Sequence, residues 1–180
     1  MNKALFLDRD GTLIEHKPYL YKPQEVILLP GVIAALRHAR EAGYLLFLFT
    51  NQSGVGRGYF KLDDVHQVHA QLIESIGLGS DIFKEICVAG EHPDDPSIYR
   101  KPSPRFILEM IAKYNINPEP SWMIGDSPCD WQAGLRAGIS AAAVRSNLTS
   151  AASCTEAQIC SVAVYDNLTA FIQSALPATS

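Results

Sequence analysis

The sequence predicts an α/β fold: a three-layer α/β/α sandwich built around a mainly parallel sheet. Short apolar runs alternate along the chain with segments of helical periodicity, which is the pattern of βα units. Most of these runs are nearly continuous in apolar residues, as expected for strands covered on both faces. At 180 residues the chain fits a single core. We therefore expect one domain over residues 1–176 and a frayed tail at 177–180.

Short apolar runs are expected to form the strands of this sheet. Each run is followed directly by a polar, charged or glycine residue, which marks the end of a strand. In chain order the expected strands are Ala4–Leu7, Tyr44–Phe49, Ile82–Ala89, Trp122–Ile124, Ala141–Val144 and Val162–Tyr165.

The segments between the strands carry apolar residues three or four positions apart, which predicts amphipathic helices. Glycines that follow three of them are suited to ending a helix. The expected helices are Gly31–Ala42, Leu62–Ile76, Pro104–Tyr114, Asp130–Ala137 and Leu168–Leu176. Ser146–Ser161 lacks a strong period and is expected to be a surface connection. Only a minimal, loop-type cap is expected, formed by Glu15–Pro30 and Glu91–Pro102.

Composition limits the functional classes. The chain is 47% hydrophobic and carries a formal charge of −4, which argues against a nucleic-acid partner. No run approaches the roughly 20 apolar residues that cross a bilayer, and Asp8 interrupts the first apolar run too early for a signal peptide. We expect a cytoplasmic protein without a membrane partner, either a monomer or an oligomer of unknown size.

Polar residues gather where the expected strands end. The first strand leads into Asp8-Arg9-Asp10-Gly11-Thr12, the second into Thr50-Asn51, and the fourth into Gly125-Asp126 with Asp130 four residues on. Lys101-Pro102 precedes the third long helix. Because the carboxyl ends of parallel strands meet at one edge of a sheet, these side chains are expected to converge.

The chemistry of this set points to phosphoryl transfer. Carboxylates crowded at one edge repel one another unless a cation lies among them, and an all-oxygen ligand set suits Mg²⁺. A lysine and a threonine hydroxyl beside that cation would bind the oxygens of a phosphoryl group. We therefore expect a magnesium site and a small phosphorylated metabolite as the partner.

The motifs, taken in order, resemble those of the haloacid dehalogenase (HAD) phosphatase superfamily. They are Asp8-x-Asp10-Gly11-Thr12, Thr50-Asn51, Lys101-Pro102 and Gly125-Asp126-x-x-x-Asp130. The longer stretches DRDGTL, TNQSGVGRGYF, RKP and GDSPCDWQAG are similar to the small-cap branch, subfamily IIIA. That branch contains heptose bisphosphate and histidinol-phosphate phosphatases. The resemblance implies a Rossmann-like fold of the HAD type.

The resemblance also implies roles for the motif residues. Asp8 would be the nucleophile that forms an aspartyl phosphate, and Asp10 the general acid and base. Thr50 and Lys101 would bind the phosphoryl oxygens. The metal would be held by Asp8, the backbone oxygen of Asp10 and Asp126, with Asp130 as a further candidate that could instead cap the following helix.

Neighbouring residues receive weaker assignments. Asn51, Ser53, Arg57 and Arg100 are candidates for substrate binding, although loop arginines are often only solvated. Arg9 is expected to be a mere intervening residue whose side chain points away, because successive residues of a strand face opposite sides. His69 is expected to be a packing or surface residue.

The resemblance favours D-glycero-D-manno-heptose 1,7-bisphosphate as the substrate, with removal of the 7-phosphate. One alternative is histidinol phosphate or another small metabolite, and a second is a protein that binds phosphorylated ligands without turnover. Many members of the branch carry a zinc loop with a Cys-x-His pair and a Cys-x-Cys pair. This chain keeps Cys87 and His92 but has Ser97 and Tyr99 in place of the later thiolates. Zinc is therefore not expected.

Overall fold

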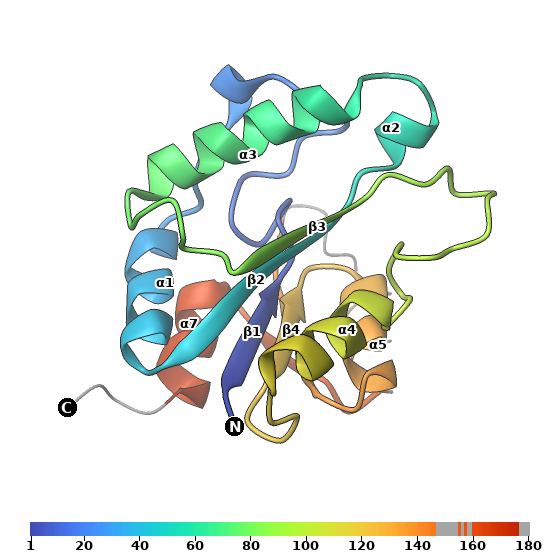
Figure 1. Ribbon diagram of the computed structural model, residues 1–180. Helices are drawn as coiled ribbons and strands as arrows, with labels where there is room; N and C mark the ends of the chain where they lie inside the picture. Colours follow the sequence, from blue (N-terminus) through green and yellow to red (C-terminus); the bar gives the residue numbers. More distant parts are fainter. Residues whose placement is uncertain (147–154, 156, 158–159, 177–180) are drawn as a thin grey trace.

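The computed structural model describes residues 1–146, 155, 157 and 160–176, and its helices and strands form three layers (Figure 1). A six-stranded sheet, parallel throughout, forms the middle layer in the order β3-β2-β1-β4-β5-β6. The strands are β1 (Lys3–Leu7), β2 (Tyr44–Asn51), β3 (Glu85–Ala89), β4 (Trp122–Gly125), β5 (Ser140–Val144) and β6 (Ala163–Tyr165).

Helices cover both faces of the sheet, which confirms the predicted fold class. One face packs against α1 (Val32–Glu41), α3 (Leu62–Ile76) and α7 (Leu168–Ala175). The other face packs against α4 (Arg105–Tyr114) and α5 (Pro128–Arg136). Two short elements, the 3-10 helix η1 (Pro23–Glu25) and α2 (Ser53–Gly56), lie in the loops after β1 and β2.

The apolar side chains of β1 explain its central place. Ala4 to Leu7 are fully buried, and their side chains alternate between the two hydrophobic clusters on opposite faces of the sheet. On the α4–α5 side, Phe6 stacks on Phe47 of β2 with ring centroids 4.8 Å apart. A strand buried on both faces holds its carboxyl end rigidly, and this end bears the first motif.

Several boundaries differ from the predictions. β3 begins at Glu85 rather than Ile82 because the preceding residues form a turn and bends. α5 begins at Pro128 rather than Asp130, since proline is well suited to a first helical turn. η1 and α2 were not predicted, because three or four residues are too few to show a period.

Some expectations are not tested by these elements. The predicted connection Ser146–Ser161 and the tail 177–180 lie largely outside the described residues, and the single-domain assignment stays a prediction. Within the described part of the chain, no helix combines the length and the apolar composition needed to cross a bilayer.

The strand order places a topological switch point between β1 and β4. From β1 the chain proceeds to β2 and β3 on one side and then returns to β4, β5 and β6 on the other. At such a switch point the loops after the two central strands diverge and leave a crevice at the carboxyl ends. The loops after β1 and β4 carry Asp8 and Asp126.

Candidate active site

A cavity of about 390 Å³ opens at the carboxyl ends of the central strands. Its walls come from the loops that follow β1, β2 and β4, together with the segment before α4. The predicted site residues among its lining are Asp8, Asp10, Asn51, Ser53, Lys101, Asp126 and Asp130. The fold therefore brings these predicted side chains together around one cavity, as expected.

The turn after β1 presents both aspartates of the first motif. The carbonyl of Arg9 accepts hydrogen bonds from the backbone N–H groups of Thr12, Leu13 and Ile14 and so closes the turn. Gly11 has a φ of +82°, and a Cβ there would collide with the carboxylate of Asp126. A glycine is required at this position by both its conformation and its neighbour.

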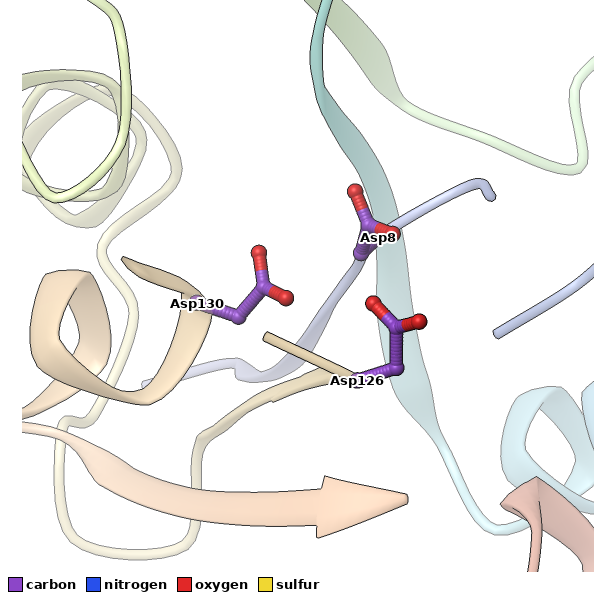
Figure 2. A group of neighbouring side chains, drawn as sticks. All are labelled: Asp8, Asp126 and Asp130. Atoms are coloured by element: carbon purple, nitrogen blue, oxygen red, sulfur yellow. The ribbon is translucent and has the colours of Figure 1, made fainter. Parts of the chain in front are cut away.

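Three carboxylates face a common space, as Figure 2 shows. One oxygen each of Asp8, Asp126 and Asp130 lies within 4.8 Å of the others. Burial, and then the charges of neighbouring carboxylates, raise the pKa of Asp8 to about 7 and that of Asp126 to about 6, although Lys101 opposes both shifts. Burial likewise raises the pKa of Asp130. A cation in this space would relieve the repulsion.

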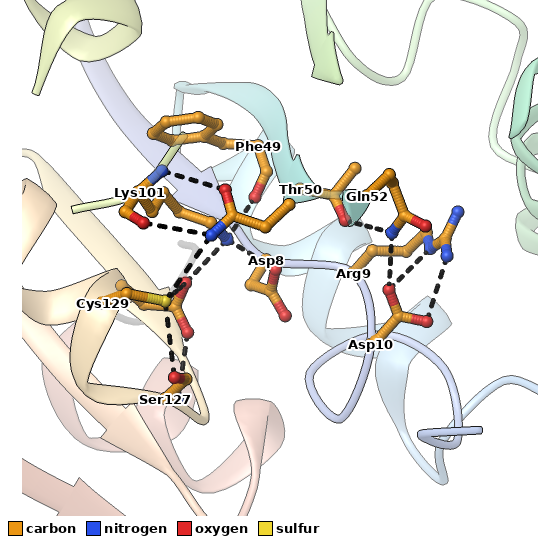
Figure 3. A network of polar contacts seen from close by, with 11 residues as sticks. Asp8, Arg9, Asp10, Phe49, Thr50, Gln52, Lys101, Ser127 and Cys129 are labelled. Carbon is orange, nitrogen blue, oxygen red and sulfur yellow. Dashed lines mark hydrogen bonds and ion pairs between the residues drawn. The ribbon is translucent and has the colours of Figure 1, made fainter. Parts of the chain in front are cut away.

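Lys101 is the buried positive charge of the site, with 3% of its surface exposed. Its Nζ lies 2.6 Å from Asp8 Oδ1 and 2.6 Å from Asp130 Oδ1, and donates to the Phe49 carbonyl at 2.7 Å (Figure 3). Burial alone would lower the pKa of Lys101, but the two carboxylates outweigh it and raise this pKa. The lysine therefore stays charged.

Asn51 fixes the backbone of Lys101. Its Oδ1 accepts from the Lys101 N–H at 2.9 Å, and its Nδ2 donates to the Lys101 carbonyl at 3.1 Å. The side chain also lines the cavity. Asn51 thus links the end of β2 to the segment before α4, a contact that the sequence did not indicate.

Asp130 is not the N-cap of α5, as one prediction had it. The N-cap is Ser127, and Asp130 is the third residue of the helix. Its Oδ2 accepts from the Ser127 N–H at 3.0 Å, while its Oδ1 pairs with Lys101. The residue therefore joins the start of α5 to the site.

The polar contacts around Asp10 correct the expectation for Arg9. Arg9 is 1% exposed, and its side chain turns back onto Asp10, with Nε 3.0 Å from Oδ2 and Nη2 3.1 Å from Oδ1. Gln52 Nε2 donates to Asp10 Oδ2 at 3.0 Å and to Thr50 Oγ1 at 2.8 Å. The expectation that the Arg9 side chain points away is therefore wrong: it lies at the cavity wall and pairs with Asp10.

The predicted substrate-binding residues divide into two groups. Asn51 and Ser53 line the cavity, whereas Arg57, which ends α2, and Arg100 are not among its lining residues. Their roles stay predictions.

Lining residues that the sequence did not single out include His16, Lys17, Tyr19, Phe60 and Cys129. Several of these belong to the expected cap loop Glu15–Pro30, but no local pattern marked them individually.

The loop before Lys101 is held by a carboxylate. Glu91 Oε1 accepts from the backbone N–H groups of Tyr99 at 2.7 Å and Arg100 at 3.3 Å. Two positions of the possible zinc loop lie nearby. Ser97 Oγ donates to the Arg100 carbonyl at 2.7 Å. Burial raises the pKa of the Cys87 thiol to about 12. The absence of zinc stays a prediction.

Chemically, the arrangement combines a buried carboxylate, a fixed lysine and a second carboxylate able to carry a proton. Thr50, the remaining predicted site residue, is buried and is not among the residues that line the cavity; its Oγ1 accepts from Gln52 Nε2. Such a set suits attack on a phosphorus atom and binding of the oxygens around it.

Comparisons with known proteins agree with this chemistry. A family model described as HAD-hydrolase-like matches residues 98–171. A D-glycero-beta-D-manno-heptose-1,7-bisphosphate 7-phosphatase of Helicobacter pylori is 39% identical over 145 residues, covering 77% of this chain and 80% of that protein. A D-glycero-D-manno-heptose-1,7-bisphosphate 7-phosphatase of Chlorobaculum tepidum is 34% identical, covering 92% of this chain and 90% of the other.

A solved structure is similar over almost the whole chain. It is the D,D-heptose 1,7-bisphosphate phosphatase of B. bronchiseptica, crystallised with magnesium and phosphate. The superposition covers 96% of this chain and 97% of that one, with a TM-score of 0.83 and 26% sequence identity.

Proposed function

The chain belongs to the HAD family of phosphatases, and we propose on this basis that it removes the 7-phosphate of D-glycero-D-manno-heptose 1,7-bisphosphate in a magnesium-dependent reaction. The observation that carries the mechanism is the contact of Lys101 with both Asp8 and Asp130 beside Asp126. The substrate assignment is supported by the relatives, whose names specify this sugar phosphate.

In the first step, a carboxylate oxygen of Asp8 attacks the phosphorus and the bond to the sugar oxygen breaks. Asp10 gives its proton to that oxygen, so the sugar leaves as an alcohol. Lys101 and Thr50 bind the phosphoryl oxygens and stabilise the charge that spreads over them. The products of this step are a free hydroxyl and an aspartyl phosphate on Asp8.

In the second step, the ionised Asp10 takes a proton from water, and the water oxygen attacks the phosphorus. The bond between phosphorus and Asp8 breaks, which releases inorganic phosphate and restores both carboxyl groups to their starting forms. The carboxyl group of Asp10 thus serves as the general acid in the first step and as the general base in the second.

The residues present fit a magnesium ion. Their oxygen ligands are of the type that Mg²⁺ prefers. Burial first, and then the neighbouring carboxylates, raise the pKa values of Asp8 and Asp126, so a cation beside them would favour their ionised forms. Asp8, Asp126 and the backbone oxygen of Asp10 would hold the ion, with Asp130 contributing through water. When bound, it would neutralise phosphoryl charge and keep Asp8 ionised.

The cavity is of a suitable size for the proposed substrate, since pockets for small metabolites commonly span about 300–1,000 Å³. His16 and Lys17 on its wall are cationic or polar groups that could meet a second anionic group. The Lys17 ammonium donates to the backbone oxygen of Glu25 at 3.3 Å, a neutral partner. A bisphosphate would use the cavity more fully than a monophosphate.

Phosphate release tests this assignment. Both anomers of heptose 1,7-bisphosphate and histidinol phosphate are compared by kcat/KM, with Mg²⁺ and after its removal by chelation, and the Asp8→Asn variant serves as the blank. We expect a large preference for the heptose substrate, dependence on Mg²⁺, and a product that keeps its anomeric phosphate by ³¹P NMR. A preference for histidinol phosphate would overturn the substrate assignment.

A further inference from the structure

We propose that Arg9 and His69 are positioning residues for Asp10, holding its carboxylate in the one orientation from which it can pass a proton to the leaving group. The inference rests on the proposed function, in which Asp10 is the proton carrier. It adds that a chain of contacts, His69 to Arg9 to Asp10, ties that carboxylate to helix α3.

The contacts between Arg9 and Asp10 are two parallel hydrogen bonds. Nε and Nη2 of Arg9 reach the two different oxygens of Asp10, at 3.0 and 3.1 Å. A planar guanidinium paired with a carboxylate in this way restricts rotation of both groups. Figure 3 shows the pair beside Gln52, whose amide donates a third hydrogen bond to Asp10 Oδ2.

His69 completes the surroundings of the arginine. Its Nε2 lies 3.3 Å from Arg9 Nη1, and the residue is 4% exposed. Burial first, and then the charge of Arg9, lower the pKa of His69 to about 3, so the ring is neutral. A neutral ring accepts the Arg9 hydrogen bond at Nε2 and carries its own proton on Nδ1.

Helix α3 supplies the rigidity. His69 lies on its buried face together with Val65, Val68 and Leu72, all fully buried. Because this helix packs on the sheet, the histidine cannot follow a moving arginine. The position of His69 is therefore set by helix α3 and not by the loop that carries Asp10.

This use of Arg9 is distinct from binding substrate. Although Arg9 lies at the cavity wall, its guanidinium is buried and all three of its nitrogens have partners. The Asp10 side chain is 16% exposed and opens to the cavity. A substrate would therefore meet the carboxylate, with the arginine behind it.

The inference has a specific kinetic consequence. A phosphate ester with an alkyl leaving group needs a proton from Asp10, whereas p-nitrophenyl phosphate has a leaving group stable as an anion. The ratio kcat/KM reports only steps up to release of the first product. Misplacing Asp10 should therefore lower kcat/KM for the alkyl ester far more than for the aryl ester.

The experiment compares Arg9→Met with Asp10→Asn on heptose bisphosphate and p-nitrophenyl phosphate. We expect Arg9→Met to lower kcat/KM for the sugar ester by about 100-fold and for the aryl ester by less than about 3-fold, within the usual range of general acid catalysis. Equal losses on the two esters, or no loss on either, would overturn the inference. Arg37→Met, on the exposed face of α1, controls for removal of an arginine.

A second pair of variants keeps the test decisive if Arg9→Met does not fold. His69→Gln retains a side-chain acceptor for Arg9 Nη1, and His69→Leu removes it. We expect only the leucine variant to show the selective loss on the sugar ester. If Asp10→Asn itself fails to distinguish the two esters, the proposed role of Asp10 fails; if it distinguishes them and the Arg9 and His69 variants do not, this inference alone fails.

Discussion

Lys101 accounts for much of the local charge balance in the site. Its ammonium touches two of the three clustered carboxylates, and its backbone is held by Asn51. Asp126 lies on the other side of the cluster and accepts from Ser146 Oγ at 2.6 Å. The carboxylates are therefore not equivalent: Asp8 and Asp130 pair with the lysine, whereas Asp126 pairs with Ser146 and is the proposed ligand of the cation.

This difference predicts unequal effects of two matched substitutions. Asp126→Asn should raise the Mg²⁺ concentration for half-maximal activity at least about 10-fold, as expected when a ligand charge is lost. Asp130→Asn should change that concentration less and raise the KM for substrate more, because it removes one of the two carboxylates that hold Lys101. Magnesium titrations of phosphate release measure both quantities, and the reverse ranking would contradict the assignment.

The individual residues show what a sequence pattern can and cannot indicate. Asp8 and Asp126 were predicted to converge because both directly follow strands that end at one edge of the sheet, and Lys101 joins them from the segment before α4. The partners of Arg9 and Asp130 were missed, since each depends on a side chain far away in the sequence: His69 for one and Lys101 for the other. Spacing along one element carries no information about such contacts.

The turn after β1 carries both aspartates of the first motif, Asp8 and Asp10. Its glycine at position 11 combines a positive φ with close contact to Asp126, whereas Gly138, which follows α5, has a φ of +77° and open space around it. The two positions therefore share the backbone requirement and differ only in what surrounds them.

Alanine at each glycine separates these two effects. Gly138→Ala should cost about 1–2 kcal/mol of unfolding free energy, the usual penalty of a left-handed residue. Gly11→Ala should cost more and should also reduce phosphate release, because the new methyl group displaces the Asp126 carboxylate. Urea unfolding and activity assays check this, and equal effects of the two variants on activity would count against it.

Elements were predictable where a long period or an apolar run defined them. Helix α3 spans the predicted residues Leu62–Ile76 because its apolar positions repeat over four turns and Gly77 ends it. Helix α5 begins two residues before the predicted start because Pro128, with its fixed φ, is well suited to the first helical position, and Ser127 caps the helix. Helix α2 is too short to be recognised from spacing, yet it carries Ser53 to the cavity wall.

For the whole molecule, the buried His69 makes stability depend on pH. Its pKa is about 3 in the folded state and near 6.5 in the unfolded chain. Between these values the unfolded state binds more protons, so this group's contribution is complete above pH 6.5 and is lost as the pH falls toward 3. Asp8 and Asp126, whose pKa values are raised, act in the opposite direction.

Comparison of wild type with His69→Gln isolates the histidine, because the carboxylates are common to both. When the pH falls from 7.5 to 5.0, the unfolding free energy of the wild type should decrease by about 2 kcal/mol more than that of the variant. The histidine contributes about 1.4 kcal/mol for each pH unit below 6.5. Urea unfolding without added metal measures the two changes. Parallel pH dependences would show that His69 is not held neutral.

The arrangement of the whole sheet was only partly accessible from the sequence. Alternating strands and helices predicted three layers and a parallel sheet, and both are confirmed. The order of the strands was not predicted, because it is decided by which helices cover which face. That order places β1 beside β4 and so creates the crevice in which Asp8 meets Asp126.

The most direct test of the mechanism is to trap the phosphorylated protein. Wild type is mixed with heptose bisphosphate and Mg²⁺, quenched in acid within a turnover, digested, and examined by mass spectrometry, with Asp8→Asn as the control. We predict one phosphoryl group on the peptide that contains Asp8, and none in the variant, which should also lack turnover. Phosphate release by the Asp8→Asn variant at the wild-type rate would contradict the proposed role of Asp8 as the nucleophile.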